Sequence, residues 1–250
     1  MAGYGLAMQL SAPSSLTADP VETVLDLSEI DVDMRGKPLF RGLSARFARG
    51  EMTLIVGAAG SGKSRLAALL SRTISPDRGQ FTTRGAIAPV IGQYAGLGET
   101  ATLERDLGLR AAAHGLDTRQ YVDEVARIIG NPAAIRKPFE AASGSEKGLI
   151  GRASALLVPA SVYISDNAAL TAGEPGPFKP LFARRRREAA MIWISGVAGS
   201  VMQAKADRFM VLGGGRLHHC ASATELLDVF EAYGGAVTAG VRRAVANQNG

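Results

Sequence analysis

The stretch Gly57-Ala58-Ala59-Gly60-Ser61-Gly62-Lys63-Ser64 matches the pattern G-x-x-x-x-G-K-[ST]. Glycines in this pattern let backbone N–H groups close around phosphate oxygens, and the N-terminus of the following helix adds partial positive charge. The preceding residues, 52–56, predict a buried strand, and residues 65–70 predict the start of a helix. This strand–loop–helix context favours a phosphate-binding loop over a chance glycine-rich turn.

The loop and the helix start define the residues that are expected to hold a nucleotide. Lys63 is expected to reach the β- and γ-phosphates, and the hydroxyl of Ser64 is expected to ligate Mg²⁺. The full set of expected nucleotide contacts is Gly57, Ala58, Gly60, Ser61, Gly62, Lys63, Ser64 and Arg65.

A carboxylate for the metal is expected at the end of a neighbouring strand, where it can hold Mg²⁺ directly or through water. Residues 162–166 read Val-Tyr-Ile-Ser-Asp and end in Asp166. The alternative is that Asp166 merely begins a turn after the strand. Because a phosphate loop lies upstream, we favour Asp166 as a magnesium ligand.

Composition indicates a soluble globular protein, since 46% of the 250 residues are hydrophobic and 20% are charged. No apolar run reaches the roughly 18 residues that a membrane span needs, and we expect no signal peptide. The one cysteine, Cys220, excludes an internal disulfide and is expected to be a small buried residue. The net charge of +5 owes part of its value to the four arginines 184–187. We expect this run to be the solvated end of a helix, with attraction to an acidic membrane surface as the alternative.

The pattern along the chain predicts a flexible tail at residues 1–20, then an antiparallel β layer formed by residues 24–32 and 39–47. A helical block follows from about residue 100 to 151, with the second of its helices capped by Asp117 or Thr118. Later strands are predicted at residues 156–164, 191–194, 209–212 and 216–219, and later helices at 178–189 and 222–233. Residues 222–225 predict a capping box, and residues 237–250 a weak helix with a frayed end. Helices between apolar strands predict an α/β fold with a mainly parallel core sheet covered on both faces, an N-terminal antiparallel β layer and an inserted helical subdomain.

This order of segments resembles the ATP-binding subunit of an ABC transporter over roughly residues 22–233. Residues 143–147, Ser-Gly-Ser-Glu-Lys, lie where that family has its S-G-G-Q signature, and residues 206–217 resemble its "D-R-x-x-x-L-x-x-G-x-L" ending. The resemblance implies a P-loop NTPase domain over residues 21–236, a helical subdomain at about 100–155 and a C-terminal tail at 237–250. It implies ATP and Mg²⁺ as cofactors, with Gln93 as a further Mg²⁺ contact, although Gln93 can equally be an exposed loop residue.

The resemblance also implies partners. Ser143, Gly144 and Ser145 would contact ATP held by a second ATP-binding subunit, in a homodimer or a heterodimer. Within the family the chain is most similar to exporters of capsular polysaccharide, on the strength of residues 102–105 and 178–194. This similarity implies a peripheral protein at the cytoplasmic face of the inner membrane, bound to a polytopic permease, with no nucleic acid partner.

Departures from the family pattern bear on hydrolysis. Asn167 stands where the family has a glutamate that polarises the attacking water, and an amide cannot accept the proton. Gly196 stands where the family has a histidine that contacts the γ-phosphate. Glu146 replaces a neutral glutamine and is expected to bring negative charge toward an anion site. No aromatic residue for stacking on adenine is found at residues 32–34. We therefore expect ATP binding with weak or absent hydrolysis, and Asn167 and Gly196 as degenerate catalytic positions.

The alignment after Asp166 has an alternative. Residues 169–174 resemble the family's "A-L-x-V-G-D" loop, in a register that would place Asn167 at the magnesium position; we prefer Asp166 because the metal requires a carboxylate. Two other functions remain open from the sequence. One is a nucleotide-sensing regulatory or scaffold protein without a transport role, and the other is a P-loop kinase for a small acceptor.

Overall fold

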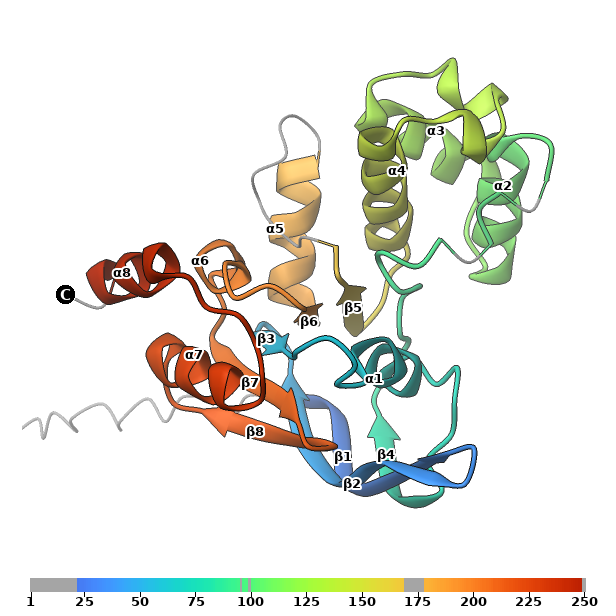
Figure 1. The fold of residues 1–250 in the computed structure, drawn as a ribbon. Helices are drawn as coiled ribbons and strands as arrows, with labels where there is room; N and C mark the ends of the chain where they lie inside the picture. The colour runs from blue at the N-terminus through green and yellow to red at the C-terminus, as the bar shows by residue number, and fades with distance from the viewer. Residues whose placement is uncertain (1–21, 95, 99, 169–177, 249–250) are drawn as a thin grey trace, which may run out of the picture.

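The architecture consists of two β-sheets with helices packed around them, as Figure 1 shows. It was derived from a computed structural model, which describes residues 22–94, 96–98, 100–168 and 178–248. The strands are β1 (Thr23–Met34), β2 (Lys37–Ala48), β3 (Met52–Val56), β4 (Arg78–Thr83), β5 (Val162–Asp166), β6 (Ala190–Ser195), β7 (Arg208–Gly213) and β8 (Arg216–Cys220). The helices are α1 (Lys63–Leu70), α2 (Leu103–Ala113), α3 (Thr118–Ile129), α4 (Gly144–Leu157), α5 (Phe178–Glu188), α6 (Ser200–Ala204), α7 (Ala223–Ala232) and α8 (Ala239–Gln248), with two 3-10 turns at Ala134–Arg136 and Phe139–Ala141. The predicted tail at 1–20 lies outside the described residues.

The predicted fold class is confirmed. The core sheet has the strand order β5-β6-β3-β7-β8, in which only β8 runs antiparallel to its neighbour. The other sheet has the order β2-β1-β4 and is antiparallel throughout. The carboxyl ends of β3, β5 and β6 therefore meet at one edge of the core sheet.

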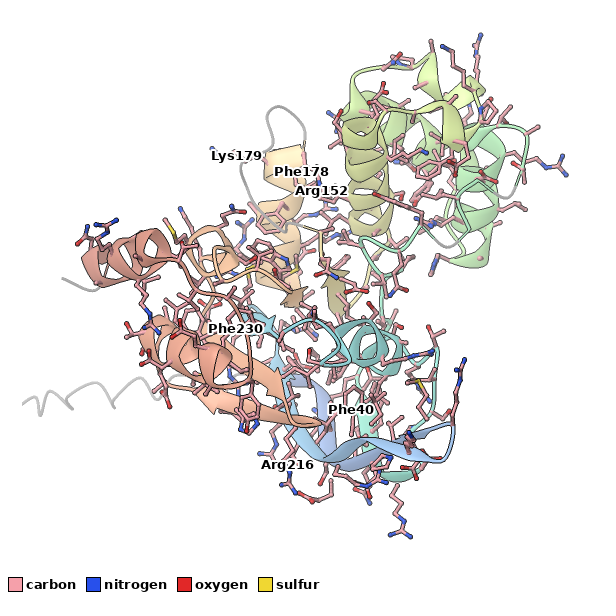
Figure 2. All side chains as sticks on the ribbon, in the orientation of Figure 1. Phe40, Arg152, Phe178, Lys179, Arg216 and Phe230 are labelled. Atoms are coloured by element: carbon pink, nitrogen blue, oxygen red, sulfur yellow. The ribbon has the colours of Figure 1, made fainter. Side chains whose placement is uncertain are left out.

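Alternate residues of β3 face two different clusters of buried side chains. Met52 and Leu54 pack with the cluster that includes Trp193 and Phe230, the latter labelled in Figure 2. Ile55 packs on the opposite face, with residues of α1 and of the antiparallel sheet. Because both faces are covered, all five residues of β3 are buried, as expected for a central parallel strand.

Helices α2, α3 and α4 form a group at one side of the sheets in Figure 1. Their buried side chains make a cluster of their own, which includes Leu107, Val125 and Ile150. Asp117 rather than Thr118 caps α3, because its carboxylate accepts a hydrogen bond from the backbone of Gln120 at 2.7 Å.

The prediction of an extended segment at residues 156–164 was wrong in its first part. Leu156 and Leu157 end helix α4, and β5 begins only at Val162. A short apolar run has no period that separates a buried helix from a buried strand. Pro159 lies just past the helix end, where a residue without a backbone N–H is expected.

Two smaller differences concern β4 and α7. Strand β4 was not predicted, because its sequence Arg-Gly-Gln-Phe-Thr-Thr is polar and it is held by pairing with β1. The capping box predicted at the start of α7 forms only in half: Ser222 accepts from the backbone of Glu225 at 3.1 Å, but the Glu225 carboxylate accepts from Ala221 at 2.6 Å instead.

The arginine run at 184–187 is only partly solvated, which corrects the expectation for it. Arg184 and Arg187 are exposed, whereas Arg185 is 7% exposed. Its guanidinium donates to the carbonyl oxygens of Leu156, at 2.8 Å, and Leu157, at 3.3 Å. The run therefore includes one residue that joins α5 to the end of α4.

Candidate functional site: a phosphate cradle and the strand ends beside it

The predicted phosphate loop joins β3 to α1, and two of its positions require glycine because other atoms approach them closely. Gly62 has a φ of +98°, and a Cβ there would lie 3.0 Å from the ring of the buried Phe40, which is labelled in Figure 2. At Gly57, a Cβ would lie 3.0 Å from the carbonyl oxygen of Leu212 and would overlap the hydroxyl of Ser61. The backbone thus follows a path that side chains would block.

The start of α1 has the features of an anion site. Its N-cap, Gly62, has no side chain to accept the hydrogen bonds of the first helical N–H groups. The Ser61 hydroxyl is buried and has no hydrogen-bond partner among the described residues. Ser64 and Arg65 are exposed at the same helix start. Unpaired donors at a helix N-terminus fit a phosphate group.

Lys63 lies folded across this loop. Its Nζ donates to the carbonyl oxygens of Gly57, at 2.9 Å, and Ala58, at 2.8 Å. Partial burial lowers the pKa of Lys63, and the negative charge of Asp166 acts in the opposite direction. An ammonium group held by two carbonyl oxygens can exchange them for phosphate oxygens at little cost in hydrogen bonds.

Asp166 ends β5 and is 8% exposed. The Nε2 of Gln93 donates to one carboxylate oxygen at 3.2 Å, and the Nδ2 of Asn167 donates to the other at 3.2 Å. Gln93 reaches this position because residues 87–91 run parallel to β5, with the Ile91 N–H donating to Ile164 at 2.9 Å. Carboxylate and amide oxygens suit Mg²⁺, so the donor set fits that ion.

Gly92 makes this approach possible. Its φ is +95°, and a Cβ there would overlap the carbonyl oxygen of Asp166. Gly92 was not among the predicted site residues, although a glycine directly before Gln93 is a signal for such a close backbone approach.

The loop after β6 closes the site. Gly196 donates its backbone N–H to the Oδ1 of Asn167 at 3.2 Å. A Cβ on Gly196 would lie 3.3 Å from the Cε of Lys63 and 3.5 Å from its Nζ. The structure therefore brings Lys63, Asp166, Asn167, Gly196 and Gln93 together.

Ser143, Gly144 and Ser145 lie at the N-terminus of α4. Among the described residues, no hydrogen bond, ion pair or ring contact joins them to loop 57–64. A role toward a partner's nucleotide stays a prediction.

Glu146 is held by its own helix, which changes the interpretation of its charge. Its carboxylate accepts from the Ser143 backbone at 2.9 Å and from the Ser143 hydroxyl at 2.8 Å, while the Ser143 hydroxyl accepts from the backbone of Glu146 at 3.3 Å. Hydrogen bonds from Ser143, followed by one from Asn131, lower the pKa of Glu146. This capping box, readable as S-x-x-E at 143–146, was missed in the sequence.

The described residues near the end of β1 offer no exposed aromatic ring for stacking on adenine. At the end of β1, Met34 is 38% exposed. Phe40 lies below Gly62 but is fully buried, so its ring face is already covered. Residues 169–174, on which the alternative register depends, lie outside the described residues.

A sequence profile for the family described as "ABC transporter" matches residues 40–170. The chain belongs to the ABC transporter family. The matched region contains the phosphate loop, Gln93, residues 143–147 and Asp166. ATP-binding domains of this family bind ATP, generally with Mg²⁺, work with membrane permease components and often dimerise.

Curated relatives match at low identity. The ABC transporter protein AbcA of Aeromonas salmonicida is 26% identical over 192 residues, which cover 74% of this chain and 62% of that protein. The mycobactin import ATP-binding/permease protein IrtA of Mycolicibacterium smegmatis is 27% identical over 236 residues, covering 85% of this chain and 27% of that protein. This ABC chain thus spans less than two thirds of the length of these relatives.

Solved structures show the same fold. A structure titled as the ATP binding subunit of an ABC transporter has a TM-score of 0.67 at 20% identity, covering 90% of this chain and all of that chain. A bacterial Atm1-family ABC exporter with ATP bound has a TM-score of 0.63 at 20% identity, covering 89% of this chain and 42% of that chain. Among the described residues of this ABC domain, no helix has the length and apolar character needed to span a bilayer.

Proposed function

We propose that this chain is the ATP-binding subunit of an ABC transporter, and that it holds Mg·ATP at loop 57–64 while hydrolysing it weakly or not at all. The observation that carries the proposal is an intact phosphate cradle beside a carboxylate, with an amide and a glycine at the two positions that hydrolysis needs. Family membership supports ATP as the ligand.

The residues of the cradle have separate roles. Backbone N–H groups of Gly60 and of residues 62–64 bind the phosphates, whereas the Ser61 N–H already donates to the carbonyl oxygen of Ala58 at 3.2 Å. Lys63 leaves its two loop carbonyls to meet the phosphates. Ser64, Asp166 and Gln93 hold Mg²⁺, which supplies positive charge beside the phosphate oxygens.

Weak hydrolysis follows from the residues near Asp166. The Asn167 carboxamide can orient a water molecule but cannot take its proton, and a missing general base typically lowers the rate by about 10²–10⁴-fold. Gly196 has no side chain to touch a γ-phosphate, and its N–H is already bonded to Asn167. Both features favour holding over turnover.

The transport role rests on the resemblance. Ser143, Gly144 and Ser145 complete the site of a second ATP-binding subunit, identical or different. The chain docks on a polytopic permease at the cytoplasmic face of the inner membrane. Polysaccharide is the proposed cargo, supported by the similarity of residues 102–105 and 178–194 to capsular polysaccharide exporters.

The domain spans residues 21–236, with a helical subdomain at about 100–155 that has its own buried cluster.

Equilibrium binding of a fluorescent ATP analogue tests the nucleotide site. Lys63→Ala is expected to weaken binding at least tenfold, because it removes a cation that lies folded over the loop. Lys179→Ala, on the exposed side of α5, is the matched control and is expected to bind as wild type. Equal affinities for wild type and Lys63→Ala would refute the site. Turnover at ordinary transporter rates, abolished by Lys63→Ala, would refute weak hydrolysis.

Purification of the native complex tests the transport role. The expected result is a membrane subunit that spans the bilayer several times and co-purifies with this chain. Recovery of the chain with soluble partners only would instead support a regulatory function.

A further inference from the structure

The carboxamide of Asn167 joins two loops that approach the phosphate cradle from neighbouring strands. Its Oδ1 accepts from the Gly196 backbone at 3.2 Å, and its Nδ2 donates to the Asp166 carboxylate at 3.2 Å. The polarity of the two neighbours leaves one orientation of the amide, because Gly196 offers an N–H and the carboxylate offers acceptors. A carboxamide can make both bonds, whereas the carboxylate of a glutamate or aspartate can make only the first.

The backbone at Asn167 is also suited to this residue. Its φ is +55°, in the left-handed region that asparagine tolerates better than most other side chains. Its N–H donates to the carbonyl oxygen of Ile194 at 2.9 Å, which fixes the residue against β6. The backbone of Asn167 is therefore held in place, and its short side chain reaches both Gly196 and Asp166.

On the other side of Asp166, the Nε2 of Gln93 donates to the second carboxylate oxygen at 3.2 Å. The carboxylate is thus held from both sides by amides that come from different segments. Removing the Asn167 side chain leaves one Asp166 oxygen without this donor and removes the acceptor of the Gly196 N–H.

We propose that Asn167 is a positioning residue: its carboxamide fixes the Asp166 carboxylate for Mg²⁺ and ties the Gly196 loop to it. The inference rests on the proposed function, in which Asp166 holds the metal. On this proposal, Asn167 and Gly196 form one hydrogen-bonded unit of a nucleotide-holding site. They are then not two unrelated replacements of the family's glutamate and histidine.

Asn167→Gly tests this proposal, because glycine keeps the left-handed backbone and removes the amide. The matched control is Lys205→Gly. Lys205 is also exposed and also has a left-handed backbone, with a φ of +44°. Nucleotide affinity is measured with and without Mg²⁺, using a fluorescent ATP analogue. In Asn167→Gly, the factor by which Mg²⁺ raises nucleotide affinity is expected to be about tenfold smaller than in the wild type. Tenfold is the lower end of the range for losing a residue that orients a metal ligand. Lys205→Gly is expected to keep the wild-type gain. An unchanged gain in Asn167→Gly overturns the proposal.

Amide hydrogen exchange at Gly196 gives a readout that needs no nucleotide. Loss of its one acceptor in Asn167→Gly is expected to speed exchange roughly fivefold. Asn167→Asp keeps an acceptor oxygen and is expected to retain the protection. Wild-type exchange in Asn167→Gly overturns the tie between the loops. If the wild type binds no nucleotide, the proposed function fails and takes the metal part of the inference with it, whereas the exchange result still decides the tie.

Discussion

Replacing Arg185 by methionine tests a buried hydrogen-bonded contact that joins α5 to the end of α4. The guanidinium donates from Nε to Leu156 at 2.8 Å and from Nη2 to Leu157 at 3.3 Å, and its Nη1 donates to Glu188 at 3.1 Å. Methionine keeps the apolar stem of the side chain and removes all three donors. The last carbonyl groups of α4 then lose the partners that a helix C-terminus needs.

The loss can be sized from these bonds. A hydrogen bond from a charged group contributes about 1.5–3 kcal/mol, and the bond to half-exposed Glu188 adds little because solvent screens it. Relief from burying the Arg185 charge offsets part of the loss of the two bonds to α4. We therefore expect Arg185→Met to lower the free energy of unfolding by about 2–4 kcal/mol. At about 2–4 °C per kcal/mol for a chain of this size, the melting temperature is expected to fall by roughly 4–16 °C.

Urea unfolding with a constant m-value, together with thermal unfolding, measures this loss. Arg187→Met, two residues along and exposed, is the matched control, with an expected change within about 0.5 kcal/mol. Arg185→Lys is expected to fall between the two, because lysine keeps the charge but not the planar fork. If Arg185→Met and Arg187→Met unfold at the same urea concentration, the argument from the buried carbonyls is wrong.

Two further predictions concern groups whose pKa is raised by burial. Burial, with a smaller effect of the Glu225 charge, raises the pKa of Cys220 from 9.0 to about 11. At pH 8 a disulfide reagent is therefore expected to react about 100-fold more slowly with the folded chain than with the chain in urea, and equal rates would contradict this. Burial also raises the pKa of Tyr121 from 10.0 to about 12. Because the pKa of Tyr121 is higher in the folded chain than in the unfolded chain, folding favours the protonated phenol. The contribution of Tyr121 to the free energy of unfolding is therefore fully present below pH 10 and is lost as pH rises toward 12. Tyr121→Phe is expected to flatten that loss in urea unfolding from pH 9 to 11.5, and parallel curves for the two proteins would refute it.

Local patterns sufficed to predict the nucleotide loop and its flanking elements. The apolar run of β3, the glycines and the start of α1 all lie within 19 successive residues, Met52–Leu70, and each indicates the same structure. Strand β4 could not be found in this way, because its residues are polar and it exists through pairing with β1. The prediction of a fully solvated arginine run was wrong for a related reason. Four identical side chains form no pattern that indicates which of them is buried.

The second half of the site depended on contacts between distant segments. Asp166 was predicted from the end of its strand, and the structure places it at the carboxyl end of β5. Its neighbour Gln93 was left between two readings, because the decision lies in the pairing of residues 87–91 with β5 and in the left-handed turn at Gly92. The bond between Asn167 and Gly196 spans 29 positions and involves a backbone N–H, so no side-chain pattern could show it.

Helix α4 has a hydrogen-bonded charged group at each of its ends. At its N-terminus the Glu146 carboxylate closes the capping box with Ser143. At its C-terminus the Arg185 guanidinium binds the last carbonyls. Both charges have the sign that the helix dipole favours. A second contact lies along the helix, where the Cζ of Arg152 is 5.8 Å from the centroid of the Phe178 ring. Both residues are labelled in Figure 2. Because α5 supplies both contacts, a displacement of the helix that carries Ser143 must either move α5 with it or break a buried charged hydrogen bond.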